Sequence, residues 1–469
     1  MKLLNSLIVA TSLSLLSINA NAQYEVAPGK YAVKLTDKNN SPYSINNPEK
    51  FLSQKSIDRR KKFNIKIDET DLPINPQYLD SLTKMGFKID AKSKWLNCVV
   101  LKTKIEKIDK LKNVSFVDLN YNFRAAKPKA AAQKQTLKMP DTSGISTKAT
   151  HKPIDYGYSQ KQVTMIKTNV LHEMGYRGEG MKAAIIDGGF KKARKVQVMN
   201  KAFYENRVPE IWNFVTDKSN VFTDDWHGTA VMSCMASNAE GWLVGTSPEA
   251  EFYLYNSEDG GSEYEIEEFN WAEAAERADS IGVDLINSSL GYNEFDKKLH
   301  NHTHEELNGE IGISTQAADI AASRGIVVVL AAGNEGDEEW KKISCPADAD
   351  NCLSVGAVMS FKGIEPAFFS SFGPTADGRI KPDVCAEGYM AYCSKDKKTI
   401  NAYPGTSFAS PIVAGSTLCL MQAHPNANPE TIINAIHLSS NHYNNPTDQW
   451  GYGLGNFELA HKILTAWGY

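Results

Sequence analysis

Cysteine is scarce in this chain, with seven among 469 residues, and none of the seven belongs to a Cys-x-x-Cys pair. That absence argues against a zinc site of the finger or ribbon type. Beyond the N-terminal segment no stretch is long and apolar enough to span a bilayer, so the mature protein is expected to be soluble. The basic residues are scattered, and neither a groove-reading motif nor an aromatic platform accompanies them, which argues against nucleic-acid binding.

The N-terminus has the three parts of a secretory signal peptide. Lys2 supplies the positive charge, residues 3–18 are mostly apolar, and Ala20-Asn21-Ala22 offers the small residues needed for cleavage before Gln23. A membrane anchor is disfavoured because the apolar run is short and interrupted by serine and threonine. We therefore predict a signal peptide over residues 1–22 and an exported protein, either extracellular or periplasmic.

Export makes disulfides possible for closely spaced cysteines. Cysteines within helical patterns, such as Cys234 and Cys419, are instead expected to be buried free thiols. No cysteine has the setting of a catalytic thiol. The candidate disulfides are Cys345 with Cys352 and Cys385 with Cys393.

Residues 23–124 are predicted to form a small α+β domain. Helical and strand patterns alternate along them, and this part of the chain is basic whereas the remainder is acidic. A segment opposite in charge to the rest of its own chain is best explained as an intramolecular partner. The expected helices are 47–64, 76–86 and 104–113, and the expected strands are 30–36, a pair over 87–103, and 114–124.

A change of pattern follows. Residues 125–154 are rich in Ala, Lys, Ser and Thr without a hydrophobic period, which predicts an exposed linker containing the processing site. Residues 155–469 alternate short apolar strands with helices, which predicts an α/β domain with a doubly wound, mostly parallel sheet. Functional residues should then lie at the carboxyl ends of the strands. The expected strands are 181–186, 252–255, 283–287, 325–330 and 353–358; the expected helices are 227–237, 269–281, 314–324, 407–422, 429–438 and 457–466.

Four residues occupy such positions. Asp187 and Asn334 each end a strand, while His227 and Ser407 each open a helix. Each alone has an ordinary structural explanation as a turn residue or helix cap. Together they are more specific, because a serine hydroxyl needs a base within hydrogen-bond reach and an acid to orient that base. The Asn334 amide and the Ser407 backbone N–H could stabilise an oxyanion, and glycines beside all four residues allow close approach of a substrate backbone.

The motifs around these residues resemble the subtilisin family of serine peptidases. The similar segments are Ile-Ile-Asp-Gly-Gly at Asp187, His-Gly-Thr at His227, Ala-Ala-Gly-Asn at Asn334, Gly-Thr-Ser-Phe-Ala-Ser-Pro-Ile-Val-Ala-Gly at Ser407, Ser-Ser-Leu-Gly over 288–291, Ser-Ser-Phe-Gly-Pro over 370–374 and Lys-Pro-Asp-Val over 381–384. The resemblance runs from about residue 178 to 466. It implies a subtilisin-like fold and a serine endopeptidase that works through an acyl-enzyme.

The resemblance also implies roles for individual residues. Asp187 would be the acid that orients the imidazole of His227, and His227 would act as general base. Ser407 would be the nucleophile and Asn334 the oxyanion donor. Two segments would bind substrate by flanking the primary specificity pocket, Ser289, Leu290 and Gly291 on one side and Ala332 and Gly333 on the other. Two residues depart from the family pattern. Gly188 stands where Thr or Ser is usual, so one hydrogen bond to the Asp187 carboxylate should be missing, and Glu387 stands where Pro is common.

The N-terminal domain resembles the inhibitory prodomains of secreted subtilisin-like proteases. The resemblance implies a precursor that processes itself, is inhibited by its own prodomain and acts on polypeptide substrates. The mature form is expected to be a monomer. A separate binding domain is the alternative for residues 23–124. No cofactor is expected to be required and no metal site is assigned, although structural calcium remains open. Two weaker features could bind a cation or lie in solvent: His300, His302 and His304 with Glu305 and Glu306, and the acidic run 335–339, which could also favour basic substrate residues.

Two other functions compete with a peptidase. An esterase of the α/β-hydrolase type orders its triad Ser, Asp or Glu, then His, around Gly-x-Ser-x-Gly. Here the fifth position of the motif is Ala409 and the order is Asp187, His227, Ser407, which disfavours the esterase. A catalytically silent binding module would be indicated by loss of a catalytic side chain, and all four side chains are present.

Overall fold

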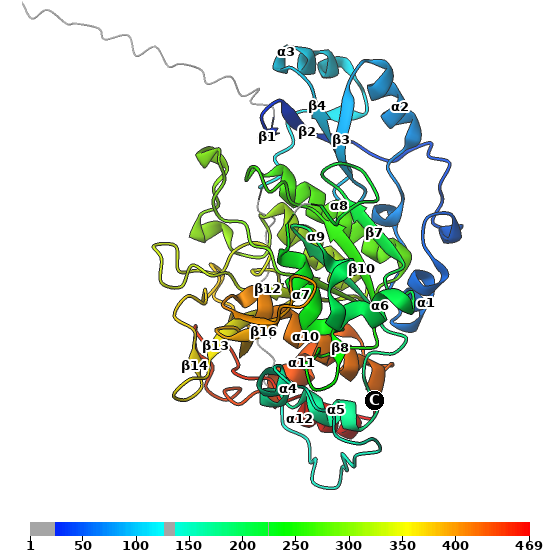
Figure 1. The fold of residues 1–469 in the computed structure, drawn as a ribbon. Coiled ribbons are helices and arrows are strands. Elements are labelled where there is room, and N and C mark those ends of the chain that lie inside the picture. Colours follow the sequence, from blue (N-terminus) through cyan, green and yellow to red (C-terminus); the bar gives the residue numbers. More distant parts are fainter. Residues whose placement is uncertain (1–23, 126–136, 224) are drawn as a thin grey trace, which may run out of the picture.

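The computed structural model describes residues 24–125, 137–223 and 225–469 (Figure 1). The predicted signal peptide over 1–22 and much of the predicted linker lie outside these ranges. No helix within them combines the length and the apolar character needed to cross a bilayer.

The N-terminal part of the described chain is built on a five-stranded antiparallel sheet with the order β1-β2-β4-β3, and β5 pairs with β2. Its elements are β1 (Tyr24–Ala27), β2 (Lys30–Leu35), α1 (Gln54–Lys62), α2 (Pro76–Lys84), β3 (Lys88–Ser93), β4 (Cys98–Lys102), α3 (Ile105–Ile108) and β5 (Val117–Asp118). Successive side chains on a strand point to opposite faces. Along β4, Val99 and Leu101 pack in this unit's own core, while Cys98 and Val100 belong to a second cluster shared with the C-terminal part of the chain.

Two segments differ from the sequence prediction in this unit. The helix expected over 47–64 is divided into a 3-10 turn, Pro48–Lys50, and α1, because Ser53 caps α1 by accepting the amide of Ser56 at 3.2 Å. The strand expected over 114–124 contributes only the two residues of β5 to the ladder.

The C-terminal part contains an eight-stranded sheet with the order β14-β13-β12-β11-β6-β10-β7, and β15 pairs with β13. All pairs are parallel except β13 with the short edge strand β14. The strands are β6 (Lys182–Asp187), β7 (Glu210–Asn213), β10 (Glu251–Asn256), β11 (Leu285–Ser288), β12 (Val327–Ala331), β13 (Leu353–Met359), β14 (Glu365–Pro366) and β15 (Val384–Glu387). The predicted α/β fold with a mostly parallel sheet is confirmed, and β7, β14 and β15 are additions to the predicted strands.

Helices cover both faces of this sheet (Figure 1). The helices α7 (His227–Ala236), α10 (Thr406–Ala423), α11 (Pro429–Ser439) and α12 (Phe457–Ala466) share one core, whereas α8 (Ile266–Ile281) and α9 (Ile313–Ser323) share the core on the other face. Successive side chains of β6 point to opposite faces of the sheet, so Ile185 packs in the first core and Ile186 in the second. The N-terminal sheet packs on the outside of α8, so the molecule has one layer more than the α/β domain alone.

Smaller elements complete the C-terminal part. The helices α4, α5 and α6 are short, and two-stranded ladders form between β8 and β9 and between β16 and β17. Their bounds are α4 (Gln160–Met165), α5 (Thr168–Glu173), α6 (Asn200–Tyr204), β8 (Asn238–Ala239), β9 (Leu243–Val244), β16 (Ala391–Cys393) and β17 (Asn401–Tyr403).

The cysteines do not form the predicted pairs in this structure. All seven are buried free thiols, as predicted for Cys234 and Cys419. Cys385 Sγ donates to the carbonyl oxygen of Trp450 at 3.5 Å rather than meeting Cys393. Cys393 instead lies against Cys234, and burial together with that neighbour raises the pKa of the Cys393 thiol well above its usual value. The tertiary packing of β15 and β16 therefore separates a pair that is close in sequence.

Candidate active site

Asp187 and His227 meet where β6 ends and α7 begins. The ring nitrogen Nδ1 of His227 lies 2.8 Å from Oδ1 of Asp187, which is fully buried and also accepts the Gly188 amide at 2.8 Å. Gly228 permits this approach, because a Cβ on that residue would lie 3.0 Å from Cβ of Asp187 and 2.6 Å from the carbonyl oxygen of Gly189. The structure therefore places the imidazole of His227 against the buried carboxylate of Asp187.

The contact with Asp187 determines the state of the imidazole. A carboxylate only accepts hydrogen bonds, so Nδ1 of His227 carries the proton and Nε2 is free to accept one. Burial lowers the pKa of His227, but the charge of Asp187 and its hydrogen bond, reinforced by Asp225, outweigh burial and raise that pKa above its usual value. The imidazole is thus a stronger base than a histidine in water.

The second oxygen of the Asp187 carboxylate is not satisfied. Oδ2 is buried and has no hydrogen-bond partner among the described residues. The neighbouring Gly188 has no side chain that could donate to it, in keeping with the missing hydrogen bond predicted from the sequence. A Cβ on Gly188 would meet only ordinary contacts, with Cγ of Glu258 at 3.7 Å, so the position has room for a side chain.

Ser407 lies in the first turn of α10, behind a glycine whose backbone is unusual. Gly405 has a φ of 148°, which favours glycine, and it lets the chain turn sharply into the helix. Ser407 Oγ donates to the carbonyl oxygen of Ser289 at 3.3 Å, and Ser289 Oγ donates to the carbonyl oxygen of Ser407 at 2.9 Å. These two bonds join the start of α10 to the end of β11.

The structure brings Ser407 near His227 without a hydrogen bond between their side chains among the described contacts. The ring of His227 and that of Phe408, the residue after Ser407, have centroids 5.9 Å apart. Hydrogen bonds between nucleophile and base are often long or absent until substrate binds. In this structure the Ser407 hydroxyl is held by Ser289 instead.

Asn334 faces the first turn of α10. Its Oδ1 accepts the amide of Thr406 at 2.9 Å and the Thr406 hydroxyl at 3.1 Å, which fixes the orientation of the side-chain amide. Its Nδ2 is therefore left to donate toward solvent, since Asn334 is exposed. The amide of Ser407 belongs to the first turn of the helix, whose N–H groups have no partner within the helix. These two donors suit an oxyanion.

The two segments predicted to bind substrate differ in accessibility. Gly291 is exposed and Leu290 is half-buried, whereas Ser289 is buried and its carbonyl is bonded to Ser407. Ala332 is fully buried, and its amide and carbonyl are already paired with Val355 and Ser344. The accessible parts of these segments are Leu290 and Gly291 after β11 and the half-buried Gly333 after β12.

A polar cavity of about 420 Å³ lies close to Gly188 and was not predicted from the sequence. Its walls include Asp225, which accepts the amides of Trp226 and His227, and Glu258, which follows β10. Burial raises the pKa of Glu258 to about 8 even though Tyr292 Oη donates to its carboxyl group at 2.6 Å. The sequence signal that could have indicated it is that Glu258 closely follows the strand expected over 252–255, at the carboxyl end of that strand.

Three carboxyl groups near this cavity are candidates for holding a metal. Oxygen atoms of Glu258, Glu263 and Glu267 all lie within 4.8 Å of one another. Burial raises their pKa values to about 8, 7 and 10, and a bound metal would release these protons. Glu267 also accepts the backbone amides of Asp259 and Tyr264. The structural calcium left open by the sequence stays a prediction.

The histidine motif after β11 does not converge on one point. His302 Nε2 lies 2.8 Å from Glu268, His300 Nδ1 lies 3.0 Å from Glu265, and His304 Nε2 lies 3.0 Å from the carbonyl oxygen of Trp340. Each imidazole has its own protein partner, which removes the basis for a shared metal. The first residue of the acidic run after Asn334 also has a partner within the protein. The Glu335 carboxylate accepts the backbone amide of Asn334 at 2.8 Å.

Comparison with known proteins agrees with this geometry. The model of the subtilase family matches residues 158–455, and that of the peptidase S8 propeptide domain of Bacteroidota matches residues 30–140. The chain belongs to the subtilase family. It is a serine-type endopeptidase that carries a propeptide domain.

Relatives cover most of the chain. Subtilisin amylosacchariticus from Bacillus subtilis subsp. amylosacchariticus is 31% identical over 314 residues, or 66% of this chain and 71% of that protein. Subtilisin from Bacillus pumilus is 31% identical over 319 residues, or 66% of this chain and 98% of that protein. Among solved structures, the prenylagaramide maturation protease PagA has a TM-score of 0.49 and 20% identity, covering 63% of this chain and 98% of that one.

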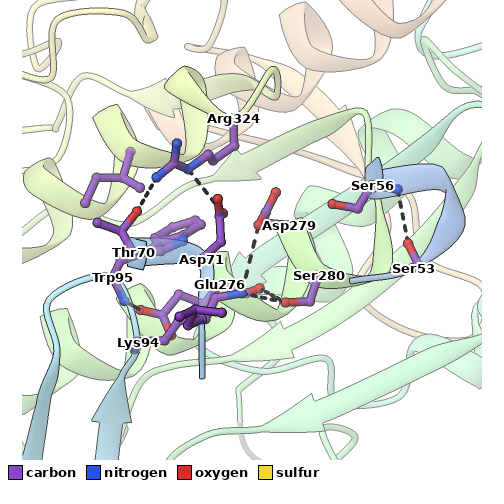
Figure 2. Close-up of polar contacts among 12 residues, drawn as sticks. Ser53, Ser56, Thr70, Asp71, Lys94, Trp95, Glu276, Asp279, Ser280 and Arg324 are labelled. Atoms are coloured by element: carbon purple, nitrogen blue, oxygen red, sulfur yellow. Dashed lines mark hydrogen bonds and ion pairs between the residues drawn. The ribbon is translucent and has the colours of Figure 1, made fainter. Parts of the chain in front are cut away.

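The propeptide domain of this subtilase is bound to α8 by backbone and side-chain hydrogen bonds (Figure 2). Glu276 accepts the amides of Lys94 and Trp95, each at 2.9 Å, and the hydroxyl of Ser93. Lys94 Nζ donates to Ser280 Oγ at 2.7 Å. A single carboxylate of α8 thereby fixes the turn between β3 and β4, which sets the register of the propeptide sheet over the helix.

A buried ion network next to this turn holds α1 of the propeptide domain, and Figure 2 shows its members Asp71, Asp279 and Arg324. Arg59 and Arg60 of α1 both bind Asp279 of α8, with Arg60 nitrogens at 2.8 and 3.0 Å from its oxygens. Arg60 also binds Asp71 at 2.7 Å, and Arg324 after α9 lies 3.4 Å from the same carboxylate. Arg59 donates to the carbonyl oxygens of Arg324 and Val283, which follow the two helices. The guanidinium groups thus bind where the helix dipoles are negative.

Proposed function

We propose that Asp187, His227 and Ser407 form the catalytic triad of this subtilase and cleave peptide bonds through an acyl-enzyme. The observation that carries the proposal is the 2.8 Å contact between His227 Nδ1 and buried Asp187, made at the sheet edge where α10 presents Ser407. A hydroxyl is a weak nucleophile, and this contact leaves Nε2 of His227 as the base that can activate it.

The proposed reaction has two halves. Ser407 Oγ attacks the carbonyl carbon while its proton moves to Nε2 of His227, and the positive imidazolium is stabilised by Asp187. The oxygen of the tetrahedral intermediate accepts hydrogen bonds from Nδ2 of Asn334 and the amide of Ser407. The imidazolium then protonates the leaving amine, and a water molecule, deprotonated by His227, hydrolyses the ester on Ser407.

Substrate is proposed to add its main chain alongside the accessible backbone of Leu290 and Gly291 on one side and Gly333 on the other, with Ser289 and Ala332 forming the walls beneath. Ser407 Oγ must leave the carbonyl oxygen of Ser289 to attack. That bond is 3.3 Å long, which is weak for a hydroxyl donor, so the rearrangement needs little free energy.

The precursor is proposed to be exported and to process itself. Residues 1–22 would be removed as a signal peptide, residues 23–124 would act as the inhibitory propeptide domain, and cleavage within the linker 125–154 would release the catalytic domain 155–469 as a monomer. No cofactor takes part in the proposed chemistry. The extensive contacts of Glu276 and Asp279 with the propeptide domain support an inhibitor that stays bound after cleavage.

A fluorophosphonate probe tests the proposed nucleophile. We expect labelling of processed wild-type protein at Ser407, and an unprocessed, unlabelled precursor from Ser407→Ala. Ser410→Ala is the matched control, because Ser410 lies one turn further along α10 and its hydroxyl is bonded to Asn287 at 2.9 Å.

Three outcomes would contradict the proposal. A trimmed Ser407→Ala protein in a host without other proteases would contradict self-processing. Wild-type protein that resists the probe would indicate a silent binding module, and turnover of esters without peptides would indicate an esterase.

A further inference from the structure

Arg124, near the end of the propeptide domain, enters a cup formed by the loop between β11 and α9. Its Nη1 donates to the carbonyl oxygen of His300 at 2.9 Å, and its Nη2 donates to that of Asn301 at 3.3 Å. Nη2 also contacts Nδ1 of His302 at 2.9 Å and the carboxylate of Glu306. Four partners from seven consecutive residues therefore surround one guanidinium, whose side chain is only 13% exposed.

Contacts within the catalytic domain fix two walls of the cup, whereas the propeptide domain adds the ring of Tyr24, which stacks on that of His300 with centroids 6.2 Å apart. Glu306 accepts the amide of Thr303 at 3.0 Å in a capping box, which aims its carboxylate. His302 Nε2 is bonded at 2.8 Å to buried Glu268, and the same carboxyl group accepts the amide and hydroxyl of Ser314 at the start of α9. These contacts do not involve Arg124, so the positions of Glu306 and His302 are fixed by partners other than that side chain.

The arrangement of acceptors suits a guanidinium better than an ammonium. Glu268 accepts a hydrogen bond from His302 Nε2, which fixes the position of the ring beside Arg124. Two carbonyls and the Glu306 carboxylate then accept hydrogen bonds from two separate nitrogens of one planar group. A lysine ammonium is a single point and cannot reach all three, whereas the arginine fork can.

The cup is also continuous with the segment proposed to bind substrate. Tyr292, the residue after Gly291, stacks on Phe295 with ring centroids 6.4 Å apart, and Phe295 meets the ring of His302 at 5.7 Å. These buried rings join the base of the cup to the residue after Gly291, so the cup and the proposed substrate segment belong to one continuous loop of the catalytic domain.

We propose that residues 300–306 form a guanidinium receptor, occupied by Arg124 in the precursor, that binds an arginine side chain of a polypeptide substrate in the mature protease. The histidine motif is thereby a receptor wall rather than a metal site. The substrate part of this inference rests on the proposed peptidase function, whereas the receptor part does not depend on it.

The receptor is tested in full-length precursor with Ser407→Ala, which removes catalysis from the experiment. Arg124→Ala in this background empties the cup. We expect millimolar ethylguanidinium to raise the thermal unfolding midpoint of this variant saturably, and ethylammonium at the same concentration to leave it unchanged. Adding Glu306→Gln should abolish the effect, while Glu305→Gln, an exposed neighbour in the same loop, should retain it. Equal effects of both cations, or no saturable effect, would overturn the receptor.

The substrate role is tested with processed wild-type enzyme and peptides that carry one arginine at successive positions on the amino-terminal side of the scissile bond. We expect one distant position at which arginine lowers KM about tenfold relative to lysine, as for a charge-assisted hydrogen bond, with kcat unchanged. Glu306→Gln should lose this preference and Glu305→Gln should keep it. A flat series in an enzyme that hydrolyses peptides would overturn the substrate role, whereas absence of any hydrolysis would count against the proposed function instead.

Discussion

Asp279→Asn should loosen the propeptide domain more than any substitution at the edge of its interface. The Asp279 carboxylate is fully buried and bound by two guanidinium groups. Asparagine keeps the shape and removes the charge, so Arg59 and Arg60 would lose the carboxylate they share, leaving Asp71 bound to Arg60 and the charge of Asp284 near Arg59. Removing one partner of a buried ion pair costs about 3–5 kcal/mol. Since 1.4 kcal/mol is about tenfold, opening of α1 from α8 should become roughly a hundredfold to a few thousandfold more frequent.

Amide hydrogen exchange in the Ser407→Ala precursor measures this opening without relying on proteolysis. The amides of α1 (Gln54–Lys62) report detachment of the anchor, because exchange requires the protected helix to open. Lys92→Ala is the control. Lys92 Nζ lies 3.4 Å from Glu273 at the interface, but its side chain is 53% exposed, and exposed pairs contribute less than about 1 kcal/mol.

Two results would refute this reasoning. If Asp279→Asn and Lys92→Ala accelerated α1 exchange equally, the buried network would contribute no more than a surface pair. If neither altered exchange in α1 while β3 and β4 remained protected, apolar packing under the sheet rather than the arginines would hold the domain. The expected result is a large acceleration confined to Asp279→Asn.

Two further predictions concern the catalytic pair. Asp187 raises the pKa of His227, and the base must be neutral to act, so kcat/KM should fall as pH decreases with a midpoint above about 6.5. Asp225→Asn should move this midpoint to lower pH, because Asp225 also raises the pKa of His227. A wild-type midpoint at or below 6.5 would contradict the assignment of His227 as the base. Gly188→Ser should raise the free energy of unfolding of the Ser407→Ala precursor by about 1–3 kcal/mol, because its hydroxyl can donate to the unsatisfied Oδ2 of Asp187; Gly188→Ala adds the Cβ alone, and equal stability of the two variants in thermal melts would show that no such bond forms.

Local patterns were sufficient to predict the main elements of the catalytic domain. Strands buried on both faces read as unbroken apolar runs, so β6, β10, β11, β12 and β13 were predicted close to their observed bounds. Prediction was poorer where pairing partners are distant or the element is short. β7 and β15 were not expected, and the helix predicted over 47–64 is interrupted where Ser53 begins a new helix.

The sequence also indicated the residues of the candidate site but not their contacts. Asp187 and His227 could be placed because Asp187 ends a strand and His227 opens a helix, and each stands next to a glycine. The same approach could not show that Ser407 is bonded to Ser289, nor that Ala332 has both backbone groups paired, because those bonds depend on how α10 and β13 pack against the strand ends.

By itself the sequence determined the order of the elements, the edge of the sheet at which the functional residues lie, and the presence of a basic N-terminal unit bound to an acidic remainder. Only the tertiary structure decided which charges meet. Arg60 and Asp279 are 219 residues apart, and His302 becomes a wall of an arginine cup only because Glu268 and Arg124 reach it from two other elements. Periodicity reports which face of an element is buried, whereas the identity of a buried charge's partner depends on the distances that folding alone creates.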